Sequence, residues 1–344
     1  MIVKYARNIF IDSEINQVGN GEIVKLNFPS SSFAVLPKEQ MRLTLTTAEI
    51  RRNFYNINQH NNTFYYYDPS GAGTYSPIVI APGNYQNFTD LATAIQTAVN
   101  TIGALNGTSV SYNAITRKYT FDLTGAAGPL VAGSRFVSFQ VKKKPQAPTG
   151  VSENGYFNDA HELLGGFPTR DNWTAPVDLF SGLTTGGPVA TTQITPFVAQ
   201  LNTLEAIYIR TNLHSGNYQT YGFEKDLPNE QGLTPTQIFA RIPLTSTAQR
   251  DIDYPFITFE DPNGLFSMYL NQTQLSQVYF SITDDKGRFL PEVAPGQAKV
   301  GNISFKLSMR WEVLHDELPP NEQRLKLENV RSSKMNSFNA ESGF

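Results

Sequence analysis

Two pairs of closely spaced aspartates are the residues in this sequence best suited to acid–base or metal chemistry. Asp251 and Asp253 are offset by two positions, which on a strand would place both carboxylates on one face. Glycosidases and Ca²⁺ sites both use carboxylates grouped in this way. Asp284 and Asp285 are adjacent in the turn sequence "DDKG". The simpler interpretation is a loop at "QRDIDYP" and a hairpin turn at "DDKG". We predict catalysis at neither pair, whereas calcium binding at either pair stays open.

The histidines do not form a metal-binding pattern. They are His60, His161, His214 and His315. None has a second histidine or a carboxylate at H-x-x-x-H or H-E-x-x-H spacing. Glu162 follows His161 directly, but adjacent residues of a helix point away from each other, so a surface or capping role is favoured. The chain has no cysteine, which excludes a disulfide, a thiolate metal site and a cysteine nucleophile. We therefore predict no catalytic residue, no metal and no cofactor.

Other candidate binding motifs are weak. The sequence contains no G-x-x-x-x-G-K-[ST] and no G-x-S-x-G. The only basic run is "VKKKPQ" at 141–146, which we interpret as a solvated strand edge that blocks unwanted pairing. Tyr65, Tyr66 and Tyr67 can contact carbohydrate or protein. Strand alternation turns Tyr66 away from the other two, so part of this cluster is predicted to be core.

The composition excludes several classes of partner. The chain has 344 residues with 27 basic and 30 acidic side chains, so its net charge is -3. A protein that binds nucleic acid directly would show a basic face instead. No apolar run approaches 18 residues, and the N-terminus lacks the apolar segment of a signal peptide. We expect no membrane span, and we expect a chain that is soluble and made or assembled inside a cell.

The strongest structural signal is "NISFKLSMRWEV" at 302–313. Every second residue is apolar, from Ile303 to Val313, and the intervening residues are polar or charged. Such a strand of twelve residues spans roughly 40 Å at about 3.3 Å per residue. Long strands of this kind cross the full width of a two-sheet sandwich. We therefore predict a buried strand that closes the core of a β-sandwich, with Trp311 inside it.

Further strands and one helix surround this signal. Shorter alternating segments occur at 22–28, 41–50, 203–213, 237–244, 254–260 and 277–282. The spacing of apolar residues predicts an amphipathic helix over 88–102, with Asn87 capping its start and Gly103 ending it. A hairpin is predicted over 110–123. The helix and the hairpin form an α+β unit between the early and late strands.

These elements predict a mainly β fold: a jelly-roll β-sandwich with an inserted small α+β domain. The predicted parts are an N-terminal arm at 1–20, the sandwich at 21–60 and 200–315, the insertion at 61–199 and a C-terminal tail at 316–344. Both termini are poor in apolar residues.

Several segments together resemble the jelly-roll capsid proteins of the adenovirus-like DNA virus lineage. This lineage includes virophages, polinton-like viruses and nucleocytoplasmic large DNA viruses. The segments are "PIVIAPGNY", the helix, "SVSYNAITRKYTF", "ELLGGF", and the run from "LEAIYIRTNL" to "ISFKLSMRWEVL". The resemblance covers most of residues 60–315, and it is one of pattern without a diagnostic motif.

The resemblance implies a non-enzymatic structural protein of the virion, assembled inside the host cell. Penton or minor capsid proteins have one jelly roll, often with an inserted domain, and form vertex pentamers. Major capsid proteins have two jelly rolls and form trimers. The strand series occurs once here, which favours the penton form. A compact double jelly roll and a receptor-binding or carbohydrate-binding β-sandwich remain alternatives.

The same resemblance suggests the partners. We expect a homo-oligomer, with a pentamer preferred over a trimer, that binds other capsid proteins through its terminal arms. A host receptor is a further candidate partner.

Overall fold

The computed structural model describes most of the chain. The described residues are 2–18, 23–28, 33–36, 39–52, 54–70, 73–128, 130–140, 160–170, 177–183, 191–213, 219–223, 231–235, 238–244, 255–270, 273–284, 290 and 303–315. The predicted tail at 316–344 lies outside them.

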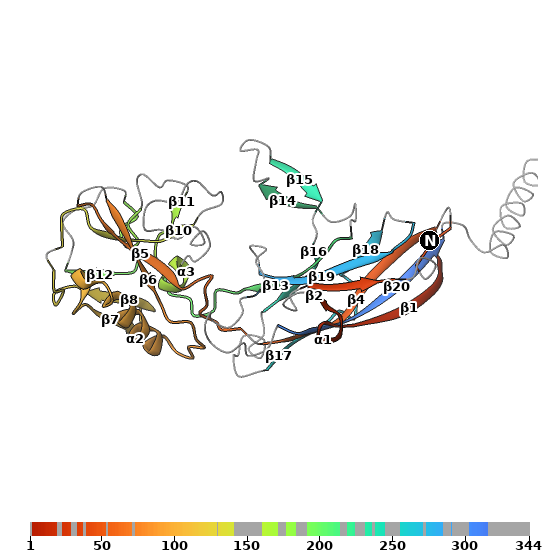
Figure 1. Cartoon of the computed structure of the whole chain (residues 1–344), viewed down its shortest axis with the longest axis horizontal. Helices are drawn as coiled ribbons and strands as arrows, with labels where there is room; N and C mark the ends of the chain where they lie inside the picture. Colours follow the sequence, from red (N-terminus) through yellow and green to blue (C-terminus); the bar gives the residue numbers. More distant parts are fainter. Residues whose placement is uncertain are drawn as a thin grey trace, which may run out of the picture.

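Two β-sheets form a sandwich (Figure 1). The first sheet has the order β1 (Ile2–Asp12), β20 (Phe305–His315), β4 (Glu39–Arg51) and β17 (Phe256–Glu260), and β18 (Ser267–Leu270) also pairs with β4. The second sheet has the order β16 (Ile238–Pro243), β13 (Ala206–Thr211), β19 (Gln277–Thr283), β3 (Ile23–Asn27) and β2 (Gln17–Val18). A short hairpin of β14 (Gln219–Phe223) and β15 (Gln231–Pro235) stands between β13 and β16 in the chain. Buried residues from both sheets belong to one hydrophobic cluster, so the sheets pack face to face.

The strand pairing is nested. The first strand, β1, pairs with the last, β20, and β3 pairs with β19. β4 then pairs with β17 and β18, and β13 pairs with β16. All of these pairs are antiparallel, and successive strands of the nest are distributed over two sheets. This is the arrangement of a jelly roll, in which a long antiparallel hairpin is wound into a sandwich. The predicted fold class is confirmed.

β20 is the central strand of the first sheet, because it pairs along its length with both β1 and β4. Its inward side chains are those with the alternating apolar pattern. Phe305, Leu307, Met309, Trp311 and Val313 are all buried. Trp311 is fully buried and packs edge-on against Tyr5 and Phe33, with ring centroids 5.4 and 4.6 Å away. The prediction of a long core strand at this position is confirmed.

The N-terminal segment differs from the prediction. Residues 1–20 were expected to form an arm, but Ile2–Asp12 is β1, the first strand of the roll. Ile11 is buried in the core, while Tyr5 and Ile9 pack against it. The inward apolar series is interrupted by Arg7, which hides the pattern in the sequence. The Arg7 guanidinium lies 6.0 Å from the Trp311 ring centroid, so a cation–π contact accommodates the charge at the edge of the core.

The insertion contains two three-stranded sheets and a helix. One sheet has the order β6 (Thr74–Val79), β5 (Thr63–Asp68) and β9 (Arg135–Val137). The other has the order β12 (Thr192–Ile194), β8 (Lys118–Asp122) and β7 (Ser109–Asn113). A parallel pair of β10 (Phe139–Gln140) and β11 (Thr169–Arg170) and the short helix α3 (His161–Leu164) complete it.

The predicted helix is α2 (Phe88–Val99), and its start is as expected. The Asn87 Oδ1 accepts a hydrogen bond of 2.8 Å from the Asp90 backbone N–H. Leu91 and Ile95 are buried in the core of the insertion. The helix ends earlier than predicted, at Val99, because the chain tightens into a 3₁₀ turn, η1 (Gly103–Leu105), rather than stopping at a glycine cap.

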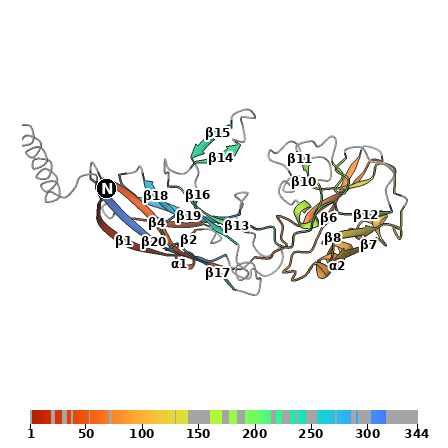
Figure 2. The same ribbon diagram turned by 180° about the vertical axis from the view of Figure 1, so that it is seen from behind.

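The roll and the insertion have separate cores and form two lobes, seen from opposite sides in Figure 1 and Figure 2. The cluster of the roll takes buried residues from Ile11 to Phe54 and from Ile207 to Val313. The cluster of the insertion takes buried residues from Ile57 to Ala199. Ile57 thus already packs in the insertion, three residues before the predicted boundary at 60.

Neighbouring substitutions in β1 distinguish a roll strand from an arm. Ile11→Ala should lower the free energy of unfolding by roughly 2–5 kcal/mol, because Ile11 is 2% exposed. Phe10→Ala should change it by less than about 0.5 kcal/mol, because Phe10 is 75% exposed. Denaturant unfolding of both variants measures the difference. Equal and negligible effects would mean that residues 2–12 contribute nothing to the roll.

Candidate assembly surface

The outward surface of the first sheet carries a balanced set of charges, which we name the charged face. Strand alternation produces it, since the inward positions of β1, β20 and β4 are taken by the core. Its basic residues are Lys4, Arg42, Arg51, Lys306 and Arg310, and its acidic residues are Asp12, Glu14, Glu49, Glu260 and Glu312. Five positive and five negative charges leave the face formally neutral.

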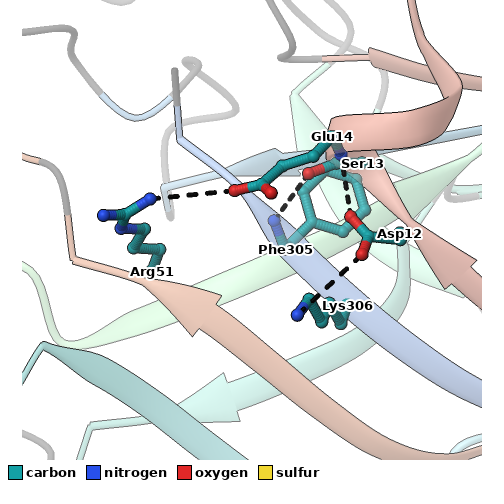
Figure 3. A network of polar contacts seen from close by, with 6 residues as sticks. All are labelled: Asp12, Ser13, Glu14, Arg51, Phe305 and Lys306. Atoms are coloured by element: carbon teal, nitrogen blue, oxygen red, sulfur yellow. Dashed lines mark hydrogen bonds and ion pairs between the residues drawn. The ribbon is translucent and has the colours of Figure 1, made fainter. Parts of the chain in front are cut away.

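The charges are arranged in pairs at the end of the sheet shown in Figure 3. The Lys306 Nζ lies 3.9 Å from an Asp12 carboxylate oxygen, and Arg51 lies 3.7 Å from Glu14. The Asp12 carboxylate also accepts a 2.9 Å hydrogen bond from the Glu14 backbone N–H. The side chains of these pairs are partly exposed, and their charged atoms are nearly 4 Å apart. Each pair therefore contributes at most about 1 kcal/mol to folding. Their main effect is to cancel charge on the surface.

The helical turn α1 (Ser13–Asn16) fixes this end of the sheet. The buried Ser13 Oγ accepts a 2.7 Å hydrogen bond from the Phe305 backbone N–H. The turn after β1 is thereby tied to the start of β20, and Glu14 is placed over the sheet (Figure 3).

A cavity of about 270 Å³ opens within this end of the charged face. Its lining residues are Glu14, Glu49, Arg51, Phe256, Ser304, Phe305 and Lys306. Two acids, two bases and two aromatic rings give it no preference for an anion or a cation. A polar surface of another protein, with charges of both signs, matches this lining.

Three exposed apolar side chains belong to the elements around the cavity. Phe10 on β1 is 75% exposed, Ile15 on α1 is 79% exposed and Phe256 on β17 is 43% exposed. Protein interfaces place aromatic residues among polar ones in this way, and aromatic anchors contribute much of the binding energy.

The opposite end of the charged face is held by a buried carboxylate. The Glu312 side chain is 3% exposed and accepts a 2.6 Å hydrogen bond from the Arg42 Nε. A second Arg42 nitrogen lies 2.5 Å from the same oxygen, and the Arg310 Nε lies 3.0 Å from the other oxygen. Glu312 therefore joins β20 to β4 by its side chain as well as by the backbone ladder.

A second internal ion pair joins the start of β4 to β1. Lys4 donates a 2.6 Å hydrogen bond to Glu39, and the Leu36 backbone N–H donates a 2.8 Å hydrogen bond to the same carboxylate. The hydrogen bond from Lys4, followed by that from Leu36, holds the pKa of Glu39 below its ordinary value, and burial opposes this shift.

The aspartate pairs considered for chemistry are placed only in part. Asp251, Asp253 and Asp285 lie outside the described residues, so the structure does not test calcium binding at either pair. Asp284 is buried at the end of β19, close to Arg210 on β13. Burial lowers the pKa of Arg210, and the negative charge of Asp284 opposes that shift.

The remaining candidates do not converge on one site. Within the described part of the chain, no group of three or more histidine, aspartate or glutamate side chains is placed to hold a metal ion. The His161 Nε2 lies 3.9 Å from its neighbour Glu162, and His214 and the basic run at 141–146 lie outside the described residues. Tyr66 packs in the core of the insertion, whereas Tyr65 packs on the opposite face of the same sheet with Tyr67. No helix of the described part is both long and apolar enough to span a bilayer.

Comparison with known proteins gives matches only among solved structures. No protein-family model matches the chain, and no curated protein matches it. The mavirus penton protein matches with a TM-score of 0.42 and 13% identity, over 90% of this chain and 99% of that one. A chain of the Sputnik virophage structure matches with a TM-score of 0.35 and 15% identity, over 91% and 98%. Since both TM-scores are below 0.5, the jelly roll is assigned from the chain's own strand pairing.

Removing the partner of the buried carboxylate should destabilise the roll. Arg42→Met leaves Glu312 buried with only Arg310, and we expect a loss of roughly 1–3 kcal/mol. The loss is below that of a fully buried pair because the Arg42 side chain is 29% exposed and is screened by solvent. Arg310→Met, whose side chain is 52% exposed, should cost less than about 1 kcal/mol. Equal unfolding midpoints for wild type and Arg42→Met would contradict a structural role for the pair.

The Glu39 pair predicts a specific loss of stability in acid. Its folded pKa lies below the ordinary value of 4.5, so its stabilisation is present above the unfolded pKa and is lost as the pH falls through the folded pKa. Glu39→Gln should therefore flatten the decline of the unfolding free energy below pH 4.5. Lys4→Met should do so partly, because it removes the largest cause of the shift. Denaturant titrations across this range check the prediction, and parallel acid profiles for wild type and Glu39→Gln would refute it.

Proposed function

We propose that this chain is a structural protein of an icosahedral DNA virus capsid, in the role of a penton or minor subunit at the vertices. The observation that carries the proposal is the nested strand pairing of one jelly roll, interrupted between β4 and β13 by a domain with its own core. This is the architecture that the resemblance in the sequence implies for such subunits.

The count of jelly rolls favours the vertex role over the major-capsid alternative. In the described part of the chain, the nested pairing occurs once. The two sheets of the insertion have three strands each, and their cluster includes the buried face of α2. A second jelly roll within residues 57–199 would need more strands than these sheets contain. Its first strand would also have to pair with its last strand, as β1 pairs with β20 in the roll.

The charged face supports assembly from many copies. Its five positive and five negative charges allow identical surfaces to approach without net repulsion. Phe10, Ile15 and Phe256 supply apolar contact area beside the pairs of charges. We infer that this face contributes to contacts between copies in a homo-oligomer, with a pentamer preferred over a trimer.

The terminal segments have different roles in this proposal. The first twelve residues are used inside the roll, so the arm that ties the protein to other capsid proteins is the segment at 316–344. We propose that this segment binds a neighbouring capsid protein. The proposed location is the virion.

A receptor-binding role for the insertion is a second candidate. Ile115 is 94% exposed at the turn between β7 and β8, where a solvated turn would carry a polar residue. Such an apolar tip suits contact with another protein.

The mass of the purified native assembly tests the proposed function. Five copies are expected from the vertex role, and three would support the major-capsid alternative. A strict monomer at high concentration, with both termini intact, would contradict both roles. Native mass spectrometry and analytical ultracentrifugation give this number directly.

Reversing one charge tests the part played by the charged face. Lys306→Glu places a third acid between Asp12 and Glu49 and should shift the protein towards smaller assemblies. Arg241→Glu makes the same change of charge on the second sheet and should leave the mass unchanged. The melting temperature of each variant controls for folding. An unchanged assembly for a folded Lys306→Glu would exclude the charged face from the interface.

A further inference from the structure

In the described part of the chain, one buried arginine of the insertion has no acidic partner. Arg135 begins β9 at the edge of the sheet β6-β5-β9, and only 7% of the residue is exposed. Its strand partner is Tyr67 on β5. A buried cation without a counter-charge is costly, and such sites in proteins are normally occupied by a carboxylate or a bound anion.

The contacts of Arg135 leave much of its donor capacity unused. One terminal nitrogen donates a long hydrogen bond of 3.3 Å to the Gly133 carbonyl oxygen. The Nε is buried and has no hydrogen-bond acceptor. Among the described residues, no carboxylate forms an ion pair with Arg135. Asp68, next to Tyr67 on the strand, accepts the Ser70 N–H, and Asp178 accepts the N–H groups of Phe180 and Ser181.

Aromatic side chains form the walls around the guanidinium. The Arg135 Cζ lies 4.7 Å from the centroid of the Tyr67 ring, and the Tyr67 and Tyr75 rings are 4.9 Å apart. Burial, and then the neighbouring Tyr67, raise the pKa of Tyr75 to about 12, while Arg135 opposes this shift.

A glycine allows the Tyr67 ring to pack closely against the backbone of residue 73. Gly73 has a φ of +72°, and a Cβ added there would lie 2.7 Å from the Tyr67 hydroxyl. The cluster also lies near the surface, because Ser70 and Thr74 on one side and Val131 and Ala132 on the other are exposed.

We propose that Arg135, together with Tyr67 and Tyr75, binds a small oxyanion such as a carboxylate or a sulfate. The anion accepts hydrogen bonds from the unused N–H groups of the guanidinium and from the Tyr67 phenol O–H, and all of these bonds are charge-assisted because the acceptor is an anion. The aromatic walls lower the local dielectric constant and strengthen the attraction. This site is independent of the capsid role proposed above, since it depends only on the core of the insertion.

Titration of the intact protein with sodium sulfate and with sodium acetate, each by isothermal calorimetry at constant ionic strength, tests the proposal. Saturable binding of at least one anion is expected. Stronger binding of acetate indicates a planar carboxylate ligand, and stronger binding of sulfate indicates a tetrahedral one. Arg135→Met should weaken binding at least tenfold, and Arg135→Lys should weaken it less, because the charge remains but the planar fork of donors is lost. Arg241→Met, on the second sheet of the roll, is the matched control and should bind as wild type does.

A measurement on the wild-type protein keeps the test valid even if a variant fails to fold. The Arg135 Nε–H resonance should move on addition of the bound anion and saturate with the calorimetric affinity. Absence of saturable binding in the wild type would overturn the proposal. Equal affinity in a folded Arg135→Met, or an Nε–H resonance that does not respond, would do the same.

Discussion

The pairing of the first strand with the last is the constraint on which the rest of the structure depends. β20 lies between β1 and β4, and its ladder to each of them joins segments about 300 and 260 positions apart in sequence. Only when β20 is in place do the inner strand pairs face each other across one core. Glu312 reinforces this position through Arg42, so a buried charge pair and the apolar face of the strand specify the same register.

The insertion is tolerated because it leaves this pairing untouched. It leaves the roll after β4 and returns at β13, which lies in the other sheet. Hydrogen bonds link the segment that leaves the roll to the segment that returns to it. The Asn61 side-chain amide donates 2.9 Å hydrogen bonds to the Asn56 carbonyl and to the Thr203 hydroxyl, which lies on the returning segment. The two cores can therefore differ in fold while the roll keeps its strand order.

Elements with a strict period could be predicted from the sequence, and those that depend on distant partners could not. β20 and α2 carry uninterrupted patterns of period 2 and 3.6, so their type and buried faces were predicted. β1 was missed because Arg7 breaks its apolar series, and the aromatic rings that accommodate Arg7 come from residues far away in the chain. Glu312 occupies an outward position, where strand alternation predicts an exposed side chain. It is buried because Arg42 and Arg310 close over it, which no local pattern reveals.

The central claim is that one jelly roll, closed by β20, folds without the domain inserted into it. Replacing residues 58–203 by a short flexible linker leaves Trp311 as the only tryptophan. We expect a single cooperative unfolding transition in Trp311 fluorescence, because the ring remains fully buried between Tyr5 and Phe33. A solvent-exposed Trp311 with no cooperative transition would show that the insertion supplies part of the core of the roll, and it would contradict the claim.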